Sequence, residues 1–248
     1  MPDYAIETTN LSKRFDDLIA VDALSIKVNK GEIYGLLGPD GAGKTTTVRL
    51  LTTILGPTSG TASVAGFNIG TQAEEIRSRI GYVSQTFNLY PDLTVSENMD
   101  FYAQLFAISR AEYAERKKEL LHFSRLADFV DRRAGKLSGG MQKKLAVSCA
   151  LVHEPDILFL DEPTSGVDPL SRLELCEILL GLFERGVTLF ATTTYLDEAE
   201  HFTRVAFMDR GRVIAEDAPD ALKRRFGSPE KPATLEEAWL ALAEEGEG

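Results

Sequence analysis

The sequence predicts an α/β fold in which a mostly parallel β-sheet carries a smaller antiparallel side-sheet and a helical insertion. Short apolar runs of the length expected for buried strands recur along the chain, and most are followed by a turn signal or a helical pattern. Strands that alternate with helices are typical of a parallel sheet covered on both faces, with ligands bound at the carboxyl ends of its strands. The predicted strands of this sheet span residues 33–37, 80–84, 157–160, 187–191 and 204–208.

Two segments near the N-terminus have a different pattern. Apolar and polar side chains alternate more regularly in residues 4–28 and 60–68 than in the buried runs. Alternation of this kind favours strands with one exposed face, so we expect these segments to form the antiparallel side-sheet.

The long central block and the C-terminal tail complete the predicted organisation. Residues 91–133 have helical periodicity throughout, and we place a helical subdomain at about residues 87–150 within a main domain of residues 1–225. Residues 226–234 have the Pro, Gly and Ser content of a linker, so residues 226–248 are expected to be a linker followed by a short amphipathic helix. Four apolar residues of the central block share one predicted helix face: Leu120, Phe123, Leu126 and Val130.

Composition limits the partners that the chain can have. Of its 248 residues 44% are hydrophobic, which is enough for a sizeable core, and the formal net charge is −11. No cluster of Lys and Arg stands out, so electrostatics disfavours a nucleic-acid partner. The two cysteines, Cys149 and Cys176, lie in apolar surroundings without paired spacing and are expected to be buried structural thiols.

No segment of the sequence resembles a membrane span or a secretory signal. The N-terminus lacks an apolar run with basic flanks, and no uncharged stretch approaches the roughly 20 residues that cross a bilayer. We therefore expect a cytoplasmic chain whose role at a membrane, if it has one, comes through a partner.

The sequence GPDGAGKT fits the phosphate-loop pattern G-x-x-x-x-G-K-[ST] and lies between a predicted strand and a predicted helix, where a phosphate loop belongs. Glycines let successive backbone N–H groups turn towards phosphate oxygens, and the helix N-terminus adds a partial positive charge. Lys44 is expected to reach the β and γ phosphates of a bound nucleotide, and the Thr45 hydroxyl to ligate Mg²⁺. The predicted nucleotide-binding residues of the loop are Gly38, Pro39, Asp40, Gly41, Ala42, Gly43, Lys44, Thr45 and Thr46.

Two adjacent acids end the apolar run of residues 157–160. In a parallel sheet, Asp161 and Glu162 would lie at the strand end beside the phosphate loop. The pair can then divide the work, with Asp161 holding Mg²⁺ through its water shell and Glu162 acting as general base on the attacking water.

The sequence LSGGMQ, residues 137–142, opens another helical run about 20 residues before this acidic pair. Ser138 and the backbone N–H groups of Gly139 and Gly140 form a second anion-binding helix start. The order of phosphate loop, LSGGMQ and acidic strand end resembles that of the ATP-binding cassette (ABC) ATPases, which drive ABC transporters. This resemblance covers nearly the whole chain and implies a P-loop nucleoside triphosphatase core of the RecA-like type.

The resemblance assigns roles to further residues. Gln85, which closes IGYVSQ, matches the family's glutamine that touches Mg²⁺ and the attacking water, and Phe15 matches the aromatic residue that stacks on adenine. An ordinary buried aromatic side chain is the other interpretation of Phe15. SGVD, residues 165–168, matches the loop that crosses the dimer interface, which adds Asp168 to the nucleotide-site residues.

The family implies a head-to-tail dimer with two ATP molecules at its interface. Each ATP contacts the phosphate loop and acidic pair of one cassette and the LSGGMQ motif of the other, here Ser138, Gly139, Gly140 and Gln142. Dimer closure is a rigid-body switch that membrane-spanning permease subunits convert into transport. The permease's short cytoplasmic helices are expected to dock on the helical insertion near Gln85, so the chain would lie peripherally at the inner face of the cell membrane.

Thr194 departs from the family pattern. In most members a histidine stands at its place and orients the catalytic glutamate and water, whereas a threonine hydroxyl is shorter and cannot carry charge. His201 lies seven residues further on, about 10 Å away along a helix, and is no replacement. The hypothesis is therefore that this cassette hydrolyses its own ATP slowly or not at all. Two alternatives stay open: Glu162 suffices without the histidine, or Thr194 is an engineered substitution.

The same departure, together with GPDGAGKTT, YLDEAE and TLEEAWLAL, resembles the N-terminal cassette of tandem-cassette ATPase subunits of bacterial drug exporters, in the daunorubicin-resistance-like branch. A second cassette with the histidine, on the same polypeptide or another chain, is then the expected partner. Two other functions remain: a regulatory cassette that closes on ATP without turnover, and a soluble ABC ATPase that acts outside transport.

Overall fold

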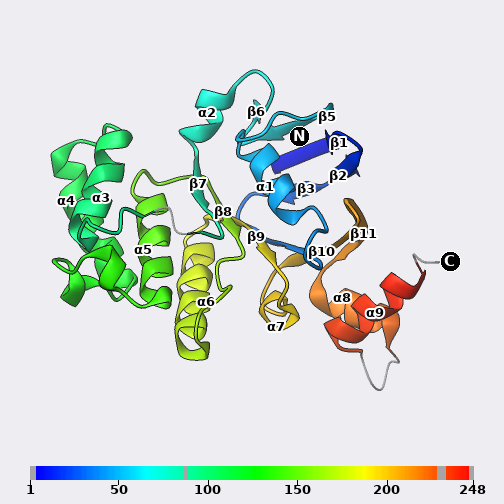
Figure 1. Ribbon diagram of the computed structural model, residues 1–248. Helices are drawn as coiled ribbons and strands as arrows, with labels where there is room; N and C mark the ends of the chain where they lie inside the picture. The colour runs from blue at the N-terminus through cyan, green and yellow to red at the C-terminus, as the bar shows by residue number, and fades with distance from the viewer. Residues whose placement is uncertain (1–3, 87–88, 228–232, 246–248) are drawn as a thin grey trace.

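The computed structural model describes residues 4–86, 89–227 and 233–245 and confirms the predicted α/β architecture (Figure 1). The main sheet has six strands in the order β11-β10-β4-β9-β8-β7. All pairs are parallel except β10 with β11. The strands are β4 Ile33–Leu37, β7 Ile80–Val83, β8 Ile157–Asp161, β9 Thr188–Thr193, β10 Arg204–Asp209 and β11 Arg212–Asp217.

The strand sequences explain why this sheet lies inside the protein. Every residue of β4, β8 and β9 is buried, which is the pattern of parallel strands covered on both faces. Tyr34 of β4 stacks on Phe190 of β9 with ring centroids 5.4 Å apart. The five predicted strands are confirmed within three residues at each end, and β11 is a sixth strand that the apolar runs did not reveal.

The N-terminal segments form the predicted antiparallel side-sheet, in the order β2-β1-β5-β6 with β3 paired to β1. This sheet lies over one end of the main sheet, next to α1 (Figure 1). Its strands are β1 Tyr4–Phe15, β2 Leu18–Leu24, β3 Lys27–Asn29, β5 Ser59–Val64 and β6 Phe67–Asn68.

Helices cover the main sheet and build the insertion. Figure 1 shows α3, α4 and α5 grouped at one side of the molecule, with α6 between this group and the sheet. These helices are α3 Val95–Leu105, α4 Arg110–Phe123, α5 Gly139–Leu151 and α6 Pro169–Glu184, with short 3₁₀ turns at Ala127–Phe129 and Ala134–Lys136. The other helices are α1 Lys44–Leu51, α2 Ala73–Arg77, α7 Leu196–Ala199, α8 Pro219–Phe226 and α9 Leu235–Glu245.

The prediction that four apolar residues of the insertion share one helix face is wrong for Leu126 and Val130. Helix α4 ends at Phe123, and Arg125 takes a left-handed φ of 58°, so Leu126 and Val130 lie beyond the helix. Leu120 and Leu126 nevertheless join one hydrophobic cluster with residues of α3, α5 and α6. The division of the chain into a main domain and a subdomain at about 87–150 stays a prediction, and residues 87–88 lie outside the described ranges.

The C-terminal segment includes the predicted amphipathic helix, α9. Trp239 of α9 meets Phe207 of β10 edge-on, with ring centroids 5.2 Å apart, and Leu235 and Leu242 are buried in the same cluster. The predicted linker falls mostly on residues 228–232, which lie outside the described ranges. None of the helices in the described part has the length and apolar character needed to cross a bilayer.

The two thiols differ in burial. Cys149 on α5 is fully buried, as expected, and burial raises the pKa of its thiol far above the ordinary value. Cys176 on α6 is only partly buried, and burial raises its pKa to about 11.

Candidate nucleotide-binding site

A cleft of about 630 Å³ opens where β4 and β8 of the main sheet end. Such a position, at the carboxyl ends of parallel strands, is where α/β proteins bind their ligands. The cleft is lined by nine of the predicted site residues: Phe15, Asp40, Gly41, Gly43, Lys44, Thr45, Thr46, Gln85 and Glu162.

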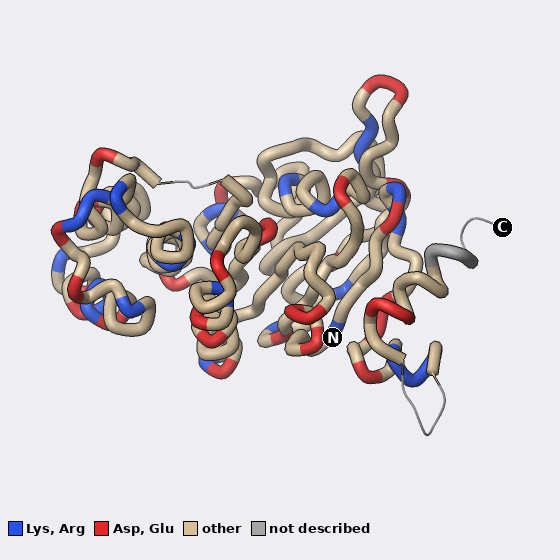
Figure 2. The backbone as a smooth tube through the Cα atoms, turned by 60° about the horizontal axis from the view of Figure 1, so that its bottom comes forward, with Lys and Arg blue, Asp and Glu red and all other residues tan. Residues whose placement is uncertain are grey.

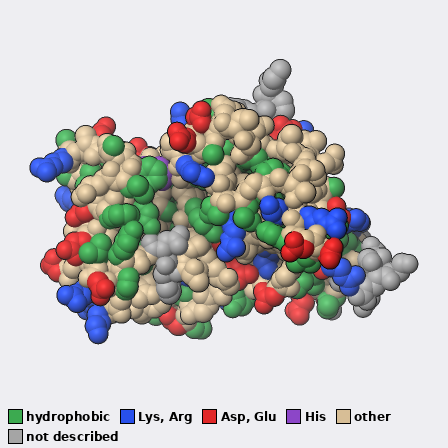
Figure 3. All heavy atoms as spheres, turned by 45° about the horizontal axis from the view of Figure 1, so that its top comes forward, with side chains coloured by type: hydrophobic (Ala, Val, Ile, Leu, Met, Phe, Trp, Pro, Cys, Tyr) green, Lys and Arg blue, Asp and Glu red, His purple; other side chains and the backbone are tan. Residues whose placement is uncertain are grey.

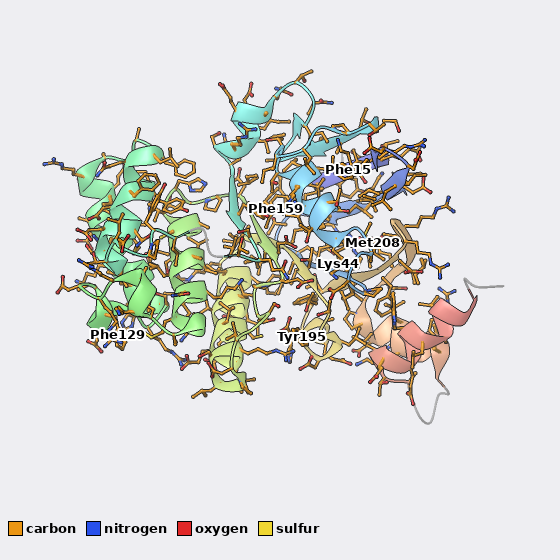
Figure 4. All side chains as sticks on the ribbon, viewed as in Figure 1. Phe15, Lys44, Phe129, Phe159, Tyr195 and Met208 are labelled. Carbon is orange, nitrogen blue, oxygen red and sulfur yellow. The ribbon has the colours of Figure 1, made fainter. Side chains whose placement is uncertain are left out.

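The phosphate loop connects β4 to α1 and packs closely against two neighbouring segments. Gly43 has a φ of 107°, and a Cβ there would lie 2.3 Å from the carbonyl oxygen of Ala20. A Cβ at Gly38 would lie 2.1 Å from the carbonyl oxygen of Met208. Glycine is therefore required at both positions for the loop to fit between these segments. Figure 4 shows Lys44 and Met208 on this side of the sheet, by α1.

Lys44 lies at the bottom of the cleft and is almost fully buried. Its Nζ donates to the carbonyl oxygens of Gly38 and Pro39 at 2.7 and 3.0 Å. The same Nζ lies 3.4 Å from Oε1 of Glu162. Buried charges need such partners, so the lysine is held at the strand end by the loop and by the acid.

A small hydroxyl and carboxylate network joins α1, β8 and β9. Asp161 Oδ1 accepts hydrogen bonds from Thr45 Oγ1 at 3.0 Å and from Thr192 Oγ1 at 2.8 Å. The Thr192 hydroxyl also accepts from the backbone N–H of Glu162 at 3.0 Å. This places Asp161 directly behind the first turn of α1, as its sequence position predicted.

Glu162 leaves the strand in a left-handed conformation with φ 49°, which turns its side chain into the cleft. Its Oε2 accepts a hydrogen bond from Gln85 Nε2 at 3.0 Å, while Oε1 faces Lys44. Residues with positive φ other than glycine are uncommon and concentrate at functional sites.

Phe15 ends β1 at the rim of the cleft and is 41% exposed, so it is not an ordinary buried aromatic residue. Lys13 Nζ lies 5.1 Å from the centroid of its ring. Leu18 and Ile19 are exposed apolar neighbours on the same wall. A flat apolar rim of this kind suits the face of a nucleotide base.

Several residues near the site escaped the sequence analysis. Leu18, Ile19, Ala20 and Arg210 line the cleft, and Thr192 supports both acids. Lys143 of α5 is buried and donates to the carbonyl oxygen of Gln85 at 2.7 Å. Burial lowers the pKa of the Lys143 ammonium, although the charges of Asp161 and Glu162 act in the opposite direction.

The LSGGMQ segment does not line this cleft. Ser138 caps α5 by accepting from the N–H of Met141 at 3.3 Å, and Gln142 Nε2 donates to the carbonyl oxygen of Ala134 at 3.0 Å. Gly140 packs so closely on α6 that a Cβ there would lie 2.2 Å from Cβ of Ser171. Gly139 has no such contact. The motif therefore forms a helix start away from the chain's own phosphate loop.

Asp168 caps α6 and does not line the cleft. Its Oδ1 accepts from the N–H of Ser171 at 3.0 Å, and hydrogen bonds to Ser171 hold the pKa of the Asp168 carboxyl below its ordinary value.

Thr194 follows the last residue of β9 and is exposed. The adjacent Thr193 points inward and donates to Glu198 Oε2 at 2.8 Å, and its hydroxyl also accepts from the N–H of Tyr195 at 3.0 Å. Glu198 in turn pairs with Arg172 of α6 at 2.7 Å. The strand end at Thr194 is thus tied to the helix that follows residues 165–168.

The donor set fits a magnesium ion bound with a nucleotide. A hydroxyl, a carboxylate and a side-chain amide, from Thr45, Asp161 and Gln85, are the oxygen ligands that Mg²⁺ takes beside substrate phosphates. Among the described residues there is no cluster of three or more His, Cys, Asp or Glu side chains that could hold a metal without such a substrate.

Known proteins resemble this chain in sequence and in fold. The family profile described as "ABC transporter" matches residues 21–165. The probable multidrug ABC transporter ATP-binding protein YbhF of Escherichia coli K12 is 40% identical over 238 residues, which is 96% of this chain. The chain spans only 41% of the length of YbhF.

Two further comparisons cover most of this chain and most of the protein compared with it. The daunorubicin/doxorubicin resistance ATP-binding protein DrrA of Streptomyces peucetius is 42% identical over 228 residues, which cover 92% of this chain and 69% of DrrA. A solved structure described as the ATP-binding subunit of an ABC transporter superposes with a TM-score of 0.86 at 30% identity, over 96% of this chain and 99% of that one. On this evidence, and with its phosphate loop, Gln85 and Glu162 meeting at one cleft, the chain belongs to the ATP-binding subunits of ABC transporters.

Proposed function

We propose that the cleft binds ATP with Mg²⁺ and that the chain is the ATP-binding subunit of an ABC exporter for drugs or other small molecules. The observation that carries the proposal is that Lys44, Glu162 and Gln85 meet in one cleft, with Thr45 bonded to Asp161 beside them. Exported drugs are suggested by the names of YbhF and DrrA.

The residues of the cleft divide the work in this proposal. Phe15 stacks on the adenine, and the phosphate loop from Gly38 to Thr46 encloses the phosphates. Thr45, Asp161 and Gln85 hold Mg²⁺, which neutralises phosphate charge when bound. Glu162 accepts a proton from the attacking water, and Gln85 orients the Glu162 carboxylate and this water.

A second cassette completes the site. Ser138, Gly139, Gly140 and Gln142 lie away from the chain's own cleft, which supports a role at the ATP of a partner cassette in a head-to-tail dimer. Asp168, at the start of α6, belongs to the loop that meets this partner. The partner's own signature motif is expected to be degenerate, because the impaired site is built from both cassettes.

The partner cassette is proposed to follow on the same polypeptide. The match to 41% of YbhF supports a chain that corresponds to one half of a longer tandem protein. The sequence downstream of residue 248 in the gene tests this directly: a second phosphate loop and a histidine at the position of Thr194 are expected there.

The chain's own ATP site is proposed to be hydrolytically impaired. Thr194 stands at the end of β9, where a histidine would reach the γ phosphate and Glu162, and its hydroxyl is too short for that contact. A regulatory cassette that closes on ATP without any turnover is the second candidate function, and Thr194 is the observation that favours it.

The permease partner is proposed to dock beside α3, which would hold the chain at the cytoplasmic face of the membrane. A groove of about 230 Å³ runs there between α1, β7 and α3, lined mainly by apolar side chains that include Ile54, Tyr102, Leu105 and Phe106. Figure 3 shows hydrophobic side chains gathered on the helical part of this surface. An apolar groove suits the buried face of a short amphipathic helix.

Phosphate release from Mg-ATP tests the proposal. The parent chain is compared with Thr194→His, Glu162→Gln and the double variant. We expect a nearly silent parent, turnover in Thr194→His, and loss of that turnover when Glu162 is replaced. A parent that already turns over in a Glu162-dependent way would remove the impaired site but keep the transporter subunit. Silence of Thr194→His with ATP-driven dimerisation would favour the regulatory cassette.

A further inference from the structure

The hairpin of β10 and β11 has an unusual residue in its turn. Asp209 pairs with Arg212, so the loop consists of Arg210 and Gly211 alone, and their φ angles are 45° and 84°. Two-residue hairpin loops with positive φ at both positions favour Asn, Asp or Gly at the first. An arginine at this position is uncommon, because positive φ is disfavoured for residues with a side chain.

The turn is attached to the phosphate loop. The N–H of Gly211 donates to the carbonyl oxygen of Ala42 at 2.9 Å, and the carbonyl oxygen of Gly211 accepts from the N–H of Asp22 at 2.8 Å. The close approach of Met208 to Gly38 fixes the strand just before the turn. The backbone of Arg210 is therefore held in a defined position relative to the loop that encloses the phosphates.

Arg210 lines the nucleotide cleft together with Phe15, Asp40 and Lys44. It is 73% exposed, and its Nε pairs with Oδ2 of Asp209 at 3.7 Å. Among the described residues that line the cleft, only Lys44 and Arg210 are cations.

The negative charge of the nucleotide and of the chain explains why a second cation, Arg210, would help binding. Lys44 lies 3.4 Å from Glu162, so its charge is largely balanced before a nucleotide binds, and the chain as a whole carries a net charge of −11. A nucleotide brings further negative charge into this acidic protein. A guanidinium group at the rim matches phosphate oxygens in geometry as well as charge.

We propose that Arg210 is a further nucleotide-binding residue, which contacts the phosphates of the nucleotide held by the phosphate loop of the same chain. This inference rests on the proposed binding of ATP in the cleft and adds a residue outside the predicted motifs. It does not depend on turnover, so an impaired site can still show it.

Nucleotide binding by the 248-residue chain tests the assignment. Fluorescently labelled ATP and ADP are titrated in the presence of Mg²⁺, with adenosine as competitor, against the parent, Arg210→Asn and Arg210→Lys. Asparagine suits the turn better than arginine, so Arg210→Asn removes the charge without endangering the hairpin. The control is Arg212→Ala, which removes a positive charge two residues further along the chain. Arg212 pairs with Asp22 at 2.6 Å.

We expect Arg210→Asn to weaken binding of ATP and ADP about 5- to 20-fold, as for a charge-assisted hydrogen bond in a partly exposed position. Arg210→Lys should retain part of the affinity, while Arg212→Ala should stay within about twofold of the parent and adenosine should bind all variants alike. Equal affinity of the parent and Arg210→Asn for ATP would overturn the inference, as would an equal loss in Arg212→Ala or a matching loss for adenosine. If the parent binds no ATP, the proposed function fails first, and the assignment of Arg210 fails with it.

Discussion

The side-chain amide of Gln85 donates a 3.0 Å hydrogen bond to the carboxylate of Glu162, across 77 residues of sequence. The backbone carbonyl of Gln85 is itself held by Lys143 of α5 at 2.7 Å. A carboxylate held by an amide on one side and by Lys44 on the other has a defined orientation. A chain of hydrogen bonds thus connects α5 of the helical insertion, through Gln85, to Glu162, the proposed general base.

Replacement of Gln85 by alanine should lower turnover much more than it lowers nucleotide affinity, because Thr45 and Asp161 would still hold Mg²⁺. Without the amide, Glu162 can swing towards Lys44, so we expect kcat to fall about 10- to 100-fold, the range for loss of a group that orients a general base. The measurement is phosphate release in the Thr194→His background, with ATP affinity from titration. Gln104→Ala, on the exposed face of α3, is the matched control and should behave as its parent. A rise in KM at unchanged kcat would contradict the orienting role.

The buried Glu198 should be a major source of stability. It is 6% exposed and pairs with Arg172, Thr193 and the hydroxyl of Thr164. Glu198→Leu removes the buried acceptor of the Arg172 guanidinium and of both hydroxyls, and we expect a loss of about 2 to 4 kcal/mol in the free energy of unfolding. Urea unfolding measures it.

Two further variants separate the buried ion pair from general damage. Adding Arg172→Met to Glu198→Leu removes the cation that has lost its buried partner, and this double variant should recover part of the loss. Asp197→Asn removes the charge of the exposed partner of Arg172. Because this ion pair is solvated, the free energy of unfolding should fall by less than about 1 kcal/mol. A Glu198→Leu chain as stable as Asp197→Asn would show that the buried pair contributes little.

Sequence patterns predicted the parts of the site that local chemistry fixes. The phosphate loop needs Gly38 and Gly43 where backbones of other segments approach, and the run before Asp161 is apolar because β8 is buried on both faces. Parallel strands bring their ends together, so one motif at the end of β4 and one at the end of β8 had to meet. Phe15, in contrast, was found through the resemblance, since nothing in the residues around it separates a rim position from a core position.

Other contacts depend on turns that the patterns did not resolve. Helix α4 ends at Phe123, so the predicted apolar face broke there. Arg210 reaches the cleft through the hairpin of β10 and β11. The sequence signal for this hairpin was weak, because arginine is not favoured in such a turn and the apolar runs did not reveal β11. The charges of the described residues are interspersed along the chain (Figure 2), so charge patterning alone gave no pointer to Arg210.

An acidic residue in the groove beside α3 should release the chain from membranes. Leu105 is 62% exposed and lines this groove, so Leu105→Asp places a charge where the proposed permease helix buries apolar surface. Leu240→Asp on α9 is the control, because Leu240 is 54% exposed and lies outside the groove. In fractionated cells of the source organism, we expect the parent and Leu240→Asp with the membranes and Leu105→Asp in the soluble fraction. Equal membrane association of all three would argue against docking at this groove.

His153 should make stability depend on pH. Its ring stacks on Phe106 with centroids 3.7 Å apart, and Nε2 bonds to the carbonyl oxygen of Ile80 at 2.9 Å. Nδ1 is buried and finds no hydrogen-bond partner within the described part of the chain. Burial lowers the pKa of His153 below its ordinary value of 6.5, against the opposing effect of the Ile80 carbonyl.

The sign of this effect follows from proton uptake. Between the folded pKa and 6.5 the unfolded chain binds more protons than the folded one, so stability is complete above 6.5 and falls as the pH drops through this window. The slope contributed by one group is at most about 1.4 kcal/mol per pH unit. In His153→Phe, which keeps an aromatic ring against Phe106, this part of the slope should vanish, whereas the exposed His122→Gln should keep it. Urea unfolding of all three chains at about pH 7.5 and 5.5 measures the difference, and parallel losses in the parent and His153→Phe would assign the acid sensitivity to other groups.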